Sequence, residues 1–396
     1  MNTSPLAAPY ERAEFLDWLR IIAIGFLLLF HTGMLFVGWG WHIENADTAV
    51  VLELPMDLAH RLRMPLLFVI AGASIFFALG RRRSGEVLVE RSKRLLVPLV
   101  AGMFLIVPPQ IYYERLFRQQ WTGDYFHYYM EKVLQLQVYP QGDFSWHHLW
   151  FVAYLFIYCL LLVPLFARLR HRACRLRPGA WLYLLALPVG LNEAVLKPLF
   201  PESHNLVRDW YILGHYALLF SYGFLLSWLP GSWQWLMQQR RKSLLLGCAV
   251  VATIVTLESV GVLHDDTIGD AFAANLFTWV WLLVMLGYGK RWLSHSNAAL
   301  RYLREASYPV YILHQTVIIA VGYYVIQAPW SWQLKYLLVL ALTLLICFVL
   351  YEALIRRLLP LRLIFGLKAR PAVQTGHQQA PTAAAVLSSP ASPVSD

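Results

Sequence analysis

The first long apolar segment of the chain, residues 15–38, carries three ionisable side chains, Asp17, Arg20 and His31. In a helix, the 11 residues from Arg20 to His31 turn through about 1100°, roughly 20° more than three full turns. The 14 residues from Asp17 to His31 turn through about 1400°, within about 40° of four turns. A helix here therefore presents all three groups on one face, with His31 about 16 Å further along the axis than Arg20.

The chemistry of His31 is the most informative of the three. A neutral imidazole accepts protons near neutral pH and can serve as a general base. Ionisable groups inside a membrane cost roughly 2.5–3.5 kcal/mol each on insertion scales, so they usually mark a polar cavity or pathway. Arg20 lies near the end of the segment and can extend its charge to the interface. His31 cannot, and is either a packed histidine bonded to a neighbour or a functional group.

Further polar groups occur along the later apolar segments. His60 and Arg63 are three residues apart and share a helix face at the start of the second segment. Arg91 and Arg94 are one turn apart at the start of the third, a pattern also typical of positive charge beside a membrane. Other ionisable residues in the later segments include His147, His148, Glu193, His215, Glu258, His314 and Glu352. Together they predict polar groups from one membrane face to the other.

These residues require membrane helices to position them. The 396 residues are 58% hydrophobic and only 14% charged, and the apolar residues come in blocks of about 20. The pattern predicts an all-α integral membrane protein with about ten transmembrane helices. The expected spans lie near residues 17–38, 57–79, 94–113, 147–167, 180–200, 207–229, 243–263, 271–289, 306–328 and 335–355.

The distribution of Lys and Arg predicts the orientation of the chain. Of the 33 Lys and Arg residues, 25 fall in the two terminal regions or in alternate loops, such as residues 80–94 and 168–179. Cytoplasmic loops are enriched in these residues, so both termini are expected in the cytoplasm. The net charge of +10 is then a consequence of topology, and it does not indicate a nucleic-acid partner.

The chain is expected to hold one membrane domain, residues 17–358. Residues 1–16 form a short cytoplasmic segment without a cleavable signal peptide, and residues 371–396, rich in Pro, Ala and Ser, form a disordered cytoplasmic tail. The four cysteines show no CxxC spacing and predict neither disulfides nor a metal site. Tyr and Trp in the outer loop 114–146 either anchor it at the interface or stack on sugars.

Known catalytic motifs narrow the function only in part. The chain has no Walker motif, GxSxG elbow, HExxH sequence or dinucleotide-binding fingerprint, which argues against ATP hydrolysis, a serine hydrolase and a zinc peptidase. Periodicity and charge alone leave open a secondary transporter or polysaccharide exporter that uses these charges as a relay, and an intramembrane enzyme.

The motifs resemble those of the acyltransferase 3 family of membrane enzymes. The resemblance covers residues 12 to about 358 and is carried by Arg, ten residues and His in the first span, by RxxR at the third, and by "RMPLLFVIAG", "HLWFV" and "SYPVYILHQ". The family moves an acyl group from a cytoplasmic donor, usually acyl-coenzyme A, to a hydroxyl on an extracytoplasmic carbohydrate or related acceptor. The resemblance therefore implies a multi-pass protein of a bacterial inner membrane, with no tightly bound cofactor or metal.

The same resemblance implies roles for individual residues. His31 is expected to be the base, Arg20 to act with it on the donor pathway, and Arg91 and Arg94 to bind the phosphates of the acyl-coenzyme A. Residues expected to contact substrate or support the site are Asp17, His60, Arg63, His148 and His314.

The segment His60, Arg63 and Met64 is most similar to a branch whose members succinylate periplasmic glucans in Gram-negative bacteria. It implies transfer of a succinyl or acetyl group to a glucan or another saccharide; O-antigen, exopolysaccharide and small glycosides remain alternative acceptors. One departure follows His314, where Gln315 and Thr316 replace the His or Asn and Pro that family members often carry.

Overall fold

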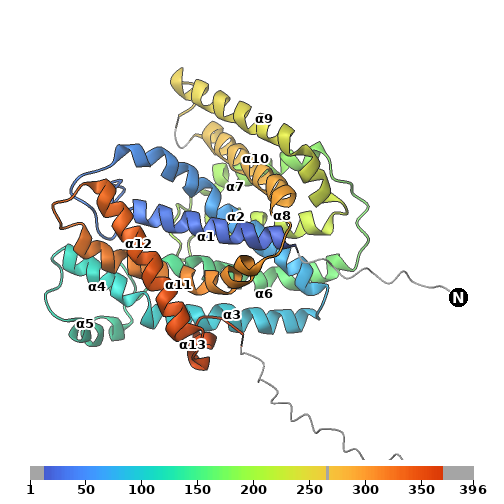
Figure 1. Cartoon of the computed structure of the whole chain (residues 1–396). Coiled ribbons are helices and arrows are strands. Elements are labelled where there is room, and N and C mark those ends of the chain that lie inside the picture. Colours follow the sequence, from blue (N-terminus) through green and yellow to red (C-terminus); the bar gives the residue numbers. More distant parts are fainter. Residues whose placement is uncertain (1–12, 265–266, 369–396) are drawn as a thin grey trace, which may run out of the picture.

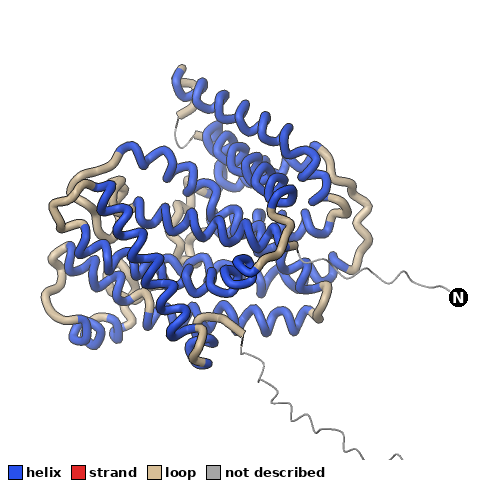
Figure 2. The backbone as a smooth tube through the Cα atoms, in the orientation of Figure 1, coloured by secondary structure: helices blue, strands red, loops and turns tan. Residues whose placement is uncertain are grey.

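A computed structural model describes residues 13–264 and 267–368. Within these ranges the chain is built from helices joined by loops, with no β-strand (Figures 1 and 2). The helices are α1 (Glu14–Gly33), η1 (Val50–Leu52), α2 (Glu53–Leu79), α3 (Ser84–Leu105), α4 (Pro108–Phe117), α5 (Tyr125–Glu131), η2 (Val133–Gln135), η3 (His147–Leu149), α6 (Trp150–Arg170), η4 (Ala180–Leu185), α7 (Ala186–Leu196), α8 (Trp210–Trp228), α9 (Ser232–Ser259), α10 (Ile268–Trp292), α11 (Ala298–Val325), α12 (Trp332–Leu350), the π-helical turn η5 (Tyr351–Ile355) and α13 (Leu359–Ile364). The all-α prediction is confirmed. The expected tail at 371–396 and most of the expected N-terminal segment lie outside the described residues.

Seven helical stretches in the described ranges are long and apolar enough to cross a membrane: Glu14–Gly33, Val50–Leu79, Ser84–Phe117, His147–Arg170, Ser232–Ser259, Ile268–Trp292 and Trp332–Ile355. The other three of the ten predicted spans coincide with helices of lower hydropathy or shorter length. Polar and aromatic residues, including His215 in α8 and His314 in α11, lower the hydropathy of those two helices. The third is the shorter apolar stretch Ala180–Leu196, in which η4 precedes α7.

The predicted span at 94–113 is two helices. α3 ends at Leu105, and Pro108 occupies the first turn of α4, where a missing N–H is tolerated. The break separates α4 from α3 and leaves the side chains of Gln110 and Glu114 fully buried. The carbonyl oxygen of Ile106, at the break, accepts a hydrogen bond from Thr316 Oγ1 at 2.6 Å. α11 therefore stabilises the broken segment.

Helices α2 and α8 cross at unusually close range. A β-carbon on Gly72 of α2 would lie 1.8 Å from the carbonyl oxygen of Phe220, and one on Gly223 of α8 would lie 1.9 Å from that of Val69. Small residues allow membrane helices to approach in this way, which increases their van der Waals contact. This contact fixes the position of α2, which carries Arg63.

Helix α1 is central to the bundle and packs against α2, α10, α11 and α12. In Figure 1, α9 and α10 lie side by side at the top of the view, and α4 and α5 lie at the left. The start of α1 and the end of α6 lie at one end of the molecule, whereas the end of α1, α4 and α5 lie at the other (Figure 1). The end of α1 meets α11, which also packs against α4.

Candidate functional site

A cavity of 800 Å³ opens at the end of the bundle that contains α4 and the start of α6. Side chains from α1, α2, α11 and η3 line it, together with the connecting segments around His42, Tyr139 and His204. Its polar lining includes His31, His42, Arg63, His147, His148, His204, Arg208 and Gln315, and its aromatic lining includes Tyr139, Trp146 and Trp150. These groups provide both acid-base chemistry and flat apolar surfaces.

His31 lines this cavity and is paired with His314, which is fully buried and is not itself a lining residue. Nδ1 of His31 lies 2.8 Å from Nε2 of His314, and Nδ1 of His314 lies 2.5 Å from the carbonyl oxygen of Tyr311. A carbonyl oxygen only accepts, so His314 carries its proton on Nδ1, and its neutral ring accepts at Nε2. His31 must then donate from Nδ1, which leaves Nε2 of the neutral His31 ring with a free lone pair. The pair therefore fixes His31 in the tautomer that a general base requires.

His148 is held in a different way. Its Nε2 donates to the carbonyl oxygen of Ile312 at 2.9 Å, and its Nδ1 accepts from Gln110 Nε2 at 3.2 Å. The Tyr311 hydroxyl donates to the His148 carbonyl at 2.6 Å. Both ring nitrogens of His148 are engaged with the protein, so His148 supports the wall beside His314, whose ring centroid is 5.4 Å away.

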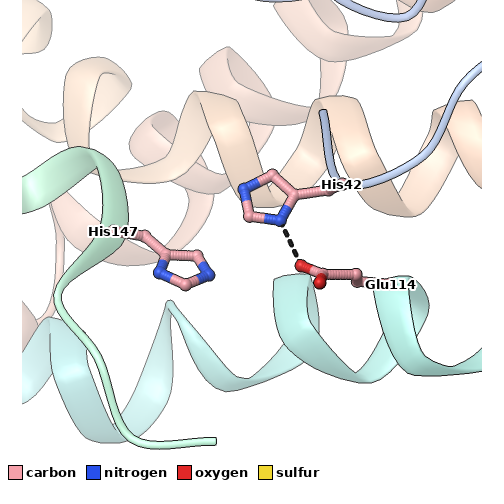
Figure 3. Close-up of side chains that lie close together, drawn as sticks. All are labelled: His42, Glu114 and His147. Carbon is pink, nitrogen blue, oxygen red and sulfur yellow. Dashed lines mark hydrogen bonds and ion pairs between the residues drawn. The ribbon is translucent and has the colours of Figure 1, made fainter. Parts of the chain in front are cut away.

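A second cluster, which we call the outer cluster, consists of His42, Glu114 and His147 (Figure 3). Glu114 is fully buried and accepts from His42 Nδ1 at 2.5 Å and from the Tyr139 hydroxyl at 3.0 Å. Burial, and then the charge of Glu114, raise the pKa of Tyr139 to about 12, so this hydroxyl remains a donor. The His147 ring stacks on the His42 ring at 4.8 Å between centroids.

The outer cluster has a ligand set compatible with a metal ion, since one ligand atom from each of its three residues lies within 4.8 Å of the others. However, the Glu114 carboxylate is already satisfied by His42 and Tyr139, with Arg118 3.3 Å away. The His42 and His147 rings are inclined by only 28°, so their in-plane lone pairs do not converge well on one point. Hydrogen bonds therefore account for Glu114 and His42, whereas the buried Nε2 of His147 has no hydrogen-bond partner among the described residues.

Gln315 and Thr316 join the two groups of histidines through α4. Gln315 Nε2 lies 3.3 Å from His42 Nε2 and 3.1 Å from Gln110 Oε1, and Gln110 in turn donates to Thr316 Oγ1 at 2.7 Å. Gln315 and Thr316, the two residues after His314, therefore both bond to the segment at the helix break.

Arg63 lines the same cavity from α2 and is buried. Its guanidinium carbon lies 3.6 Å from the centre of the Phe30 ring, and Nη2 donates to His60 Nδ1 at 3.2 Å. The predicted grouping of His60 with Arg63 is thus present, and Phe30 places Arg63 beside His31.

The remaining predicted residues lie toward the other end of α1. Arg20 Nη1 lies 2.9 Å from Asp17 Oδ1, and Nη2 donates to Ser74 Oγ at 3.1 Å. Arg304 lies 3.6 Å from Asp17. Arg20, Arg91 and Arg94 are close enough for their charges to interact.

Arg91 and Arg94 differ in their surroundings. Arg94 Nε donates to the Gly366 carbonyl at 2.9 Å, so the segment after α13 covers part of this side chain. Arg91 Nε is buried and has no hydrogen-bond partner among the described residues. Neither arginine lines the cavity, so the predicted residues form one group around His31 and another around Arg20.

Sequence reasoning did not identify His42, Glu114, Gln110 or Tyr311 as site residues. Glu114 and His42 could have been recognised as ionisable groups close to predicted span ends, but their partners come from segments far apart in the chain. His42 and Glu114 are 72 residues apart in the sequence, and His31 and His314 are 283 residues apart.

Comparison with known proteins defines the class. The model of the acyltransferase 3 family, described as an acyltransferase domain, matches residues 13–352, so the chain belongs to this family of membrane acyltransferases. It is 24% identical over 415 residues to the glucans biosynthesis protein C of Escherichia coli strain SMS-3-5, covering 94% of this chain and 98% of that protein. The protein of the same name from strain K12 matches with the same identity and coverage. No solved structure matches the chain.

Proposed function

We propose that this protein transfers an acyl group from cytoplasmic acyl-coenzyme A to a hydroxyl of an extracytoplasmic glucan or similar saccharide, in the inner membrane of a bacterium. The observation that carries the proposal is the His31–His314 pair, because it leaves a basic nitrogen on His31, a residue of the cavity wall. The family supplies the reaction class.

The reaction assigned to His31 conserves protons. Nε2 accepts the proton of the saccharide hydroxyl as its oxygen attacks the thioester carbonyl carbon. The carbon–sulfur bond then breaks, and the leaving thiolate takes the proton back from the imidazolium. The products are an oxygen ester and free coenzyme A, and His31 returns to its starting tautomer.

Arg91, Arg94 and Arg20 support the donor half of the proposal. Their clustered positive charge suits the phosphates of coenzyme A, because guanidinium groups form charge-assisted, often bidentate bonds with phosphate. Since Arg20 lies 11 residues before His31 in α1, about 16 Å along the axis, the pantetheine arm has to span this depth.

The acceptor half rests on the cavity lining and on the relatives. Tyr139, Trp146 and Trp150 offer aromatic faces of the kind that pack on sugar rings, and they lie in or beside segments predicted to be extracytoplasmic. The names of the Escherichia coli relatives refer to glucan biosynthesis, which favours a glucan among the possible saccharides.

The test is a reconstituted assay of purified protein with succinyl- or acetyl-coenzyme A and neutral glucan, with a chelator present because the proposal uses no metal. We expect acceptor-dependent release of the coenzyme A thiol and an acyl ester on the glucan by mass spectrometry. Release of the thiol without an acylated glucan would contradict the proposal that glucan is the acceptor. If folded protein released no thiol from either donor, the proposal that acyl-coenzyme A is the donor would be contradicted.

A further inference from the structure

Arg63 is a buried cation that no carboxylate of the described residues contacts directly. Its exposed fraction is 7%, and no carboxylate of residues 13–264 or 267–368 forms an ion pair with it. Its polar protein contact is the bond from Nη2 to the neutral acceptor His60 Nδ1, and Nε is buried without a hydrogen-bond partner. The charge of Glu202 acts on Arg63 from a distance, but its carboxylate forms no ion pair with Arg63 and lies 3.0 Å from His204.

Two arginines comparable to Arg63, the nearest one in sequence and the one with a similar exposed fraction, are paired, whereas Arg91, which is less buried as a whole, also has an unpartnered Nε. Arg362, with 6% exposure, lies 2.9 Å from Glu305, and Arg61, two residues before Arg63, lies 2.9 Å from Asp57. A buried charge without a counter-charge is costly in a protein and in a membrane. The contrast therefore indicates that the counter-charge of Arg63 comes from a ligand.

The position of Arg63 shows which part of a ligand would meet it. Both Arg63 and His31 line the 800 Å³ cavity. Arg63 covers the Phe30 ring, whose centroid is 5.4 Å from that of His31. An anion bound by Arg63 would thus lie next to the carbon that reacts at His31. A group this close to the reacting carbon belongs to the acyl chain itself.

We propose that Arg63 binds the free carboxylate of the transferred acyl group, so that the donor is a thioester of a dicarboxylic acid such as succinic acid. This inference rests on the proposed function, and it selects succinyl over acetyl. His60 orients the guanidinium through Nη2, while the remaining N–H groups, including the unpartnered Nε, are available to the carboxylate.

The experiment compares succinyl- with butyryl-coenzyme A, which has a methyl group in place of the carboxylate, on a neutral glucan acceptor. We expect kcat/KM of the wild type to be higher for succinyl- than for butyryl-coenzyme A. Arg63→Met should reduce the succinyl-to-butyryl ratio of kcat/KM roughly 10- to 100-fold, the size expected for one charge-assisted contact. Arg63→Lys should restore part of the ratio, because it keeps the charge without the planar fork. Arg61→Gln is the matched control and should keep the wild-type ratio.

Equal losses with both donors in Arg63→Met would overturn the inference, since they indicate a role in stabilising the reacting oxyanion or in folding. A second measurement does not depend on turnover or on coenzyme A. It compares the rise in Tm of the purified protein on addition of monomethyl succinate with the rise on addition of methyl butyrate. We expect stabilisation of the wild type by the first compound only, and its loss in Arg63→Met. Stabilisation without any acyl transfer would support the carboxylate site and contradict only the proposed function, whereas equal effects of both esters would overturn the site.

Discussion

Nδ1 of His31 lies 2.8 Å from Nε2 of His314, although the two residues are separated by 283 positions in the sequence. Because His314 also donates to the Tyr311 carbonyl, it can only accept from His31 while it is neutral. A backbone carbonyl on α11 thus fixes the proton positions on two rings, and the basic nitrogen is left on His31.

The first prediction concerns His31 itself. His31→Gln and His31→Ala should both lower kcat by about 10² to 10⁴, the usual contribution of a general base. Glutamine can form hydrogen bonds but cannot take the hydroxyl proton, so it should not rescue activity. Donor affinity and thermal stability, measured on the same preparations, should remain near the wild-type values. A packing role would give the opposite pattern, with an active His31→Gln and an unstable His31→Ala.

The second prediction concerns His314 as a positioning residue. His314→Leu removes the acceptor for His31 Nδ1–H, so the His31 ring is free to change its tautomer, and we expect kcat to fall about 10- to 100-fold. His314→Gln offers a carbonyl oxygen as acceptor and should retain more activity than the leucine variant. KM for the donor should change little in either variant. Equal activities of the two variants would show that the tautomer is not controlled by this bond.

The third prediction separates donor binding from topology. Arg91→Ala and Arg94→Ala should each raise the Kd for acyl-coenzyme A about 10-fold or more, and lysine replacements should recover only part of the affinity. Arg83→Ala is the matched control, because Arg83 is an exposed arginine of the same charged loop. Since Arg94 also donates to the Gly366 carbonyl, the thermal stability of the Arg94→Ala variant should be measured alongside its affinity. Unchanged affinity for acyl-coenzyme A in both alanine variants would show that the two arginines do not bind the donor and serve only as positive charge at a membrane boundary.

The sequence predicted the helices well, because they follow from short-range periodicity. Arg20 and His31 lie on one continuous helix, as the 11-residue spacing requires. The break at Pro108 was not predicted, because α3 and α4 together read as one apolar run.

The partners of these residues were much harder to predict. The outer cluster unites His42, Glu114 and His147 from three segments whose relative positions depend on tertiary packing. The acceptor of His31 was equally hidden, since His314 appeared in the sequence only as one polar residue in a late span. Local patterns identify which residues are unusual, whereas tertiary packing determines which of them meet.

The fourth prediction tests the crossing of α2 and α8. Gly223→Ala would place a β-carbon 1.9 Å from the Val69 carbonyl oxygen, so the two helices must separate. We expect a loss of roughly 1–3 kcal/mol in stability, measured as a lower Tm and a lower yield of folded protein. Gly25→Ala is the control, because its β-carbon meets no atom within 4 Å and alanine favours the helix. A Gly223→Ala protein as stable as Gly25→Ala would mean that the close crossing is absent.

The last prediction concerns the side of the membrane on which the cavity opens. Most of the Lys and Arg residues lie in the terminal regions and alternate loops, so the loop at 168–179 is expected in the cytoplasm and the loop at 114–146 outside. These loops also lie at opposite ends of the molecule in Figure 1, the second beside the cavity. Cys174 is a native probe of the first loop, and Gln141→Cys places a probe at an exposed position of the second.

With Cys248, an exposed thiol, replaced by serine, a membrane-impermeant thiol reagent should label Gln141→Cys from outside in cells with a permeabilised outer membrane. Cys174 should react only after the inner membrane is opened or inverted. This pattern would place the His31 cavity on the side of an extracytoplasmic saccharide and Arg91 on the side of coenzyme A. Labelling of Cys174 from outside would reverse the orientation, and the acceptor would then have to be a cytoplasmic molecule.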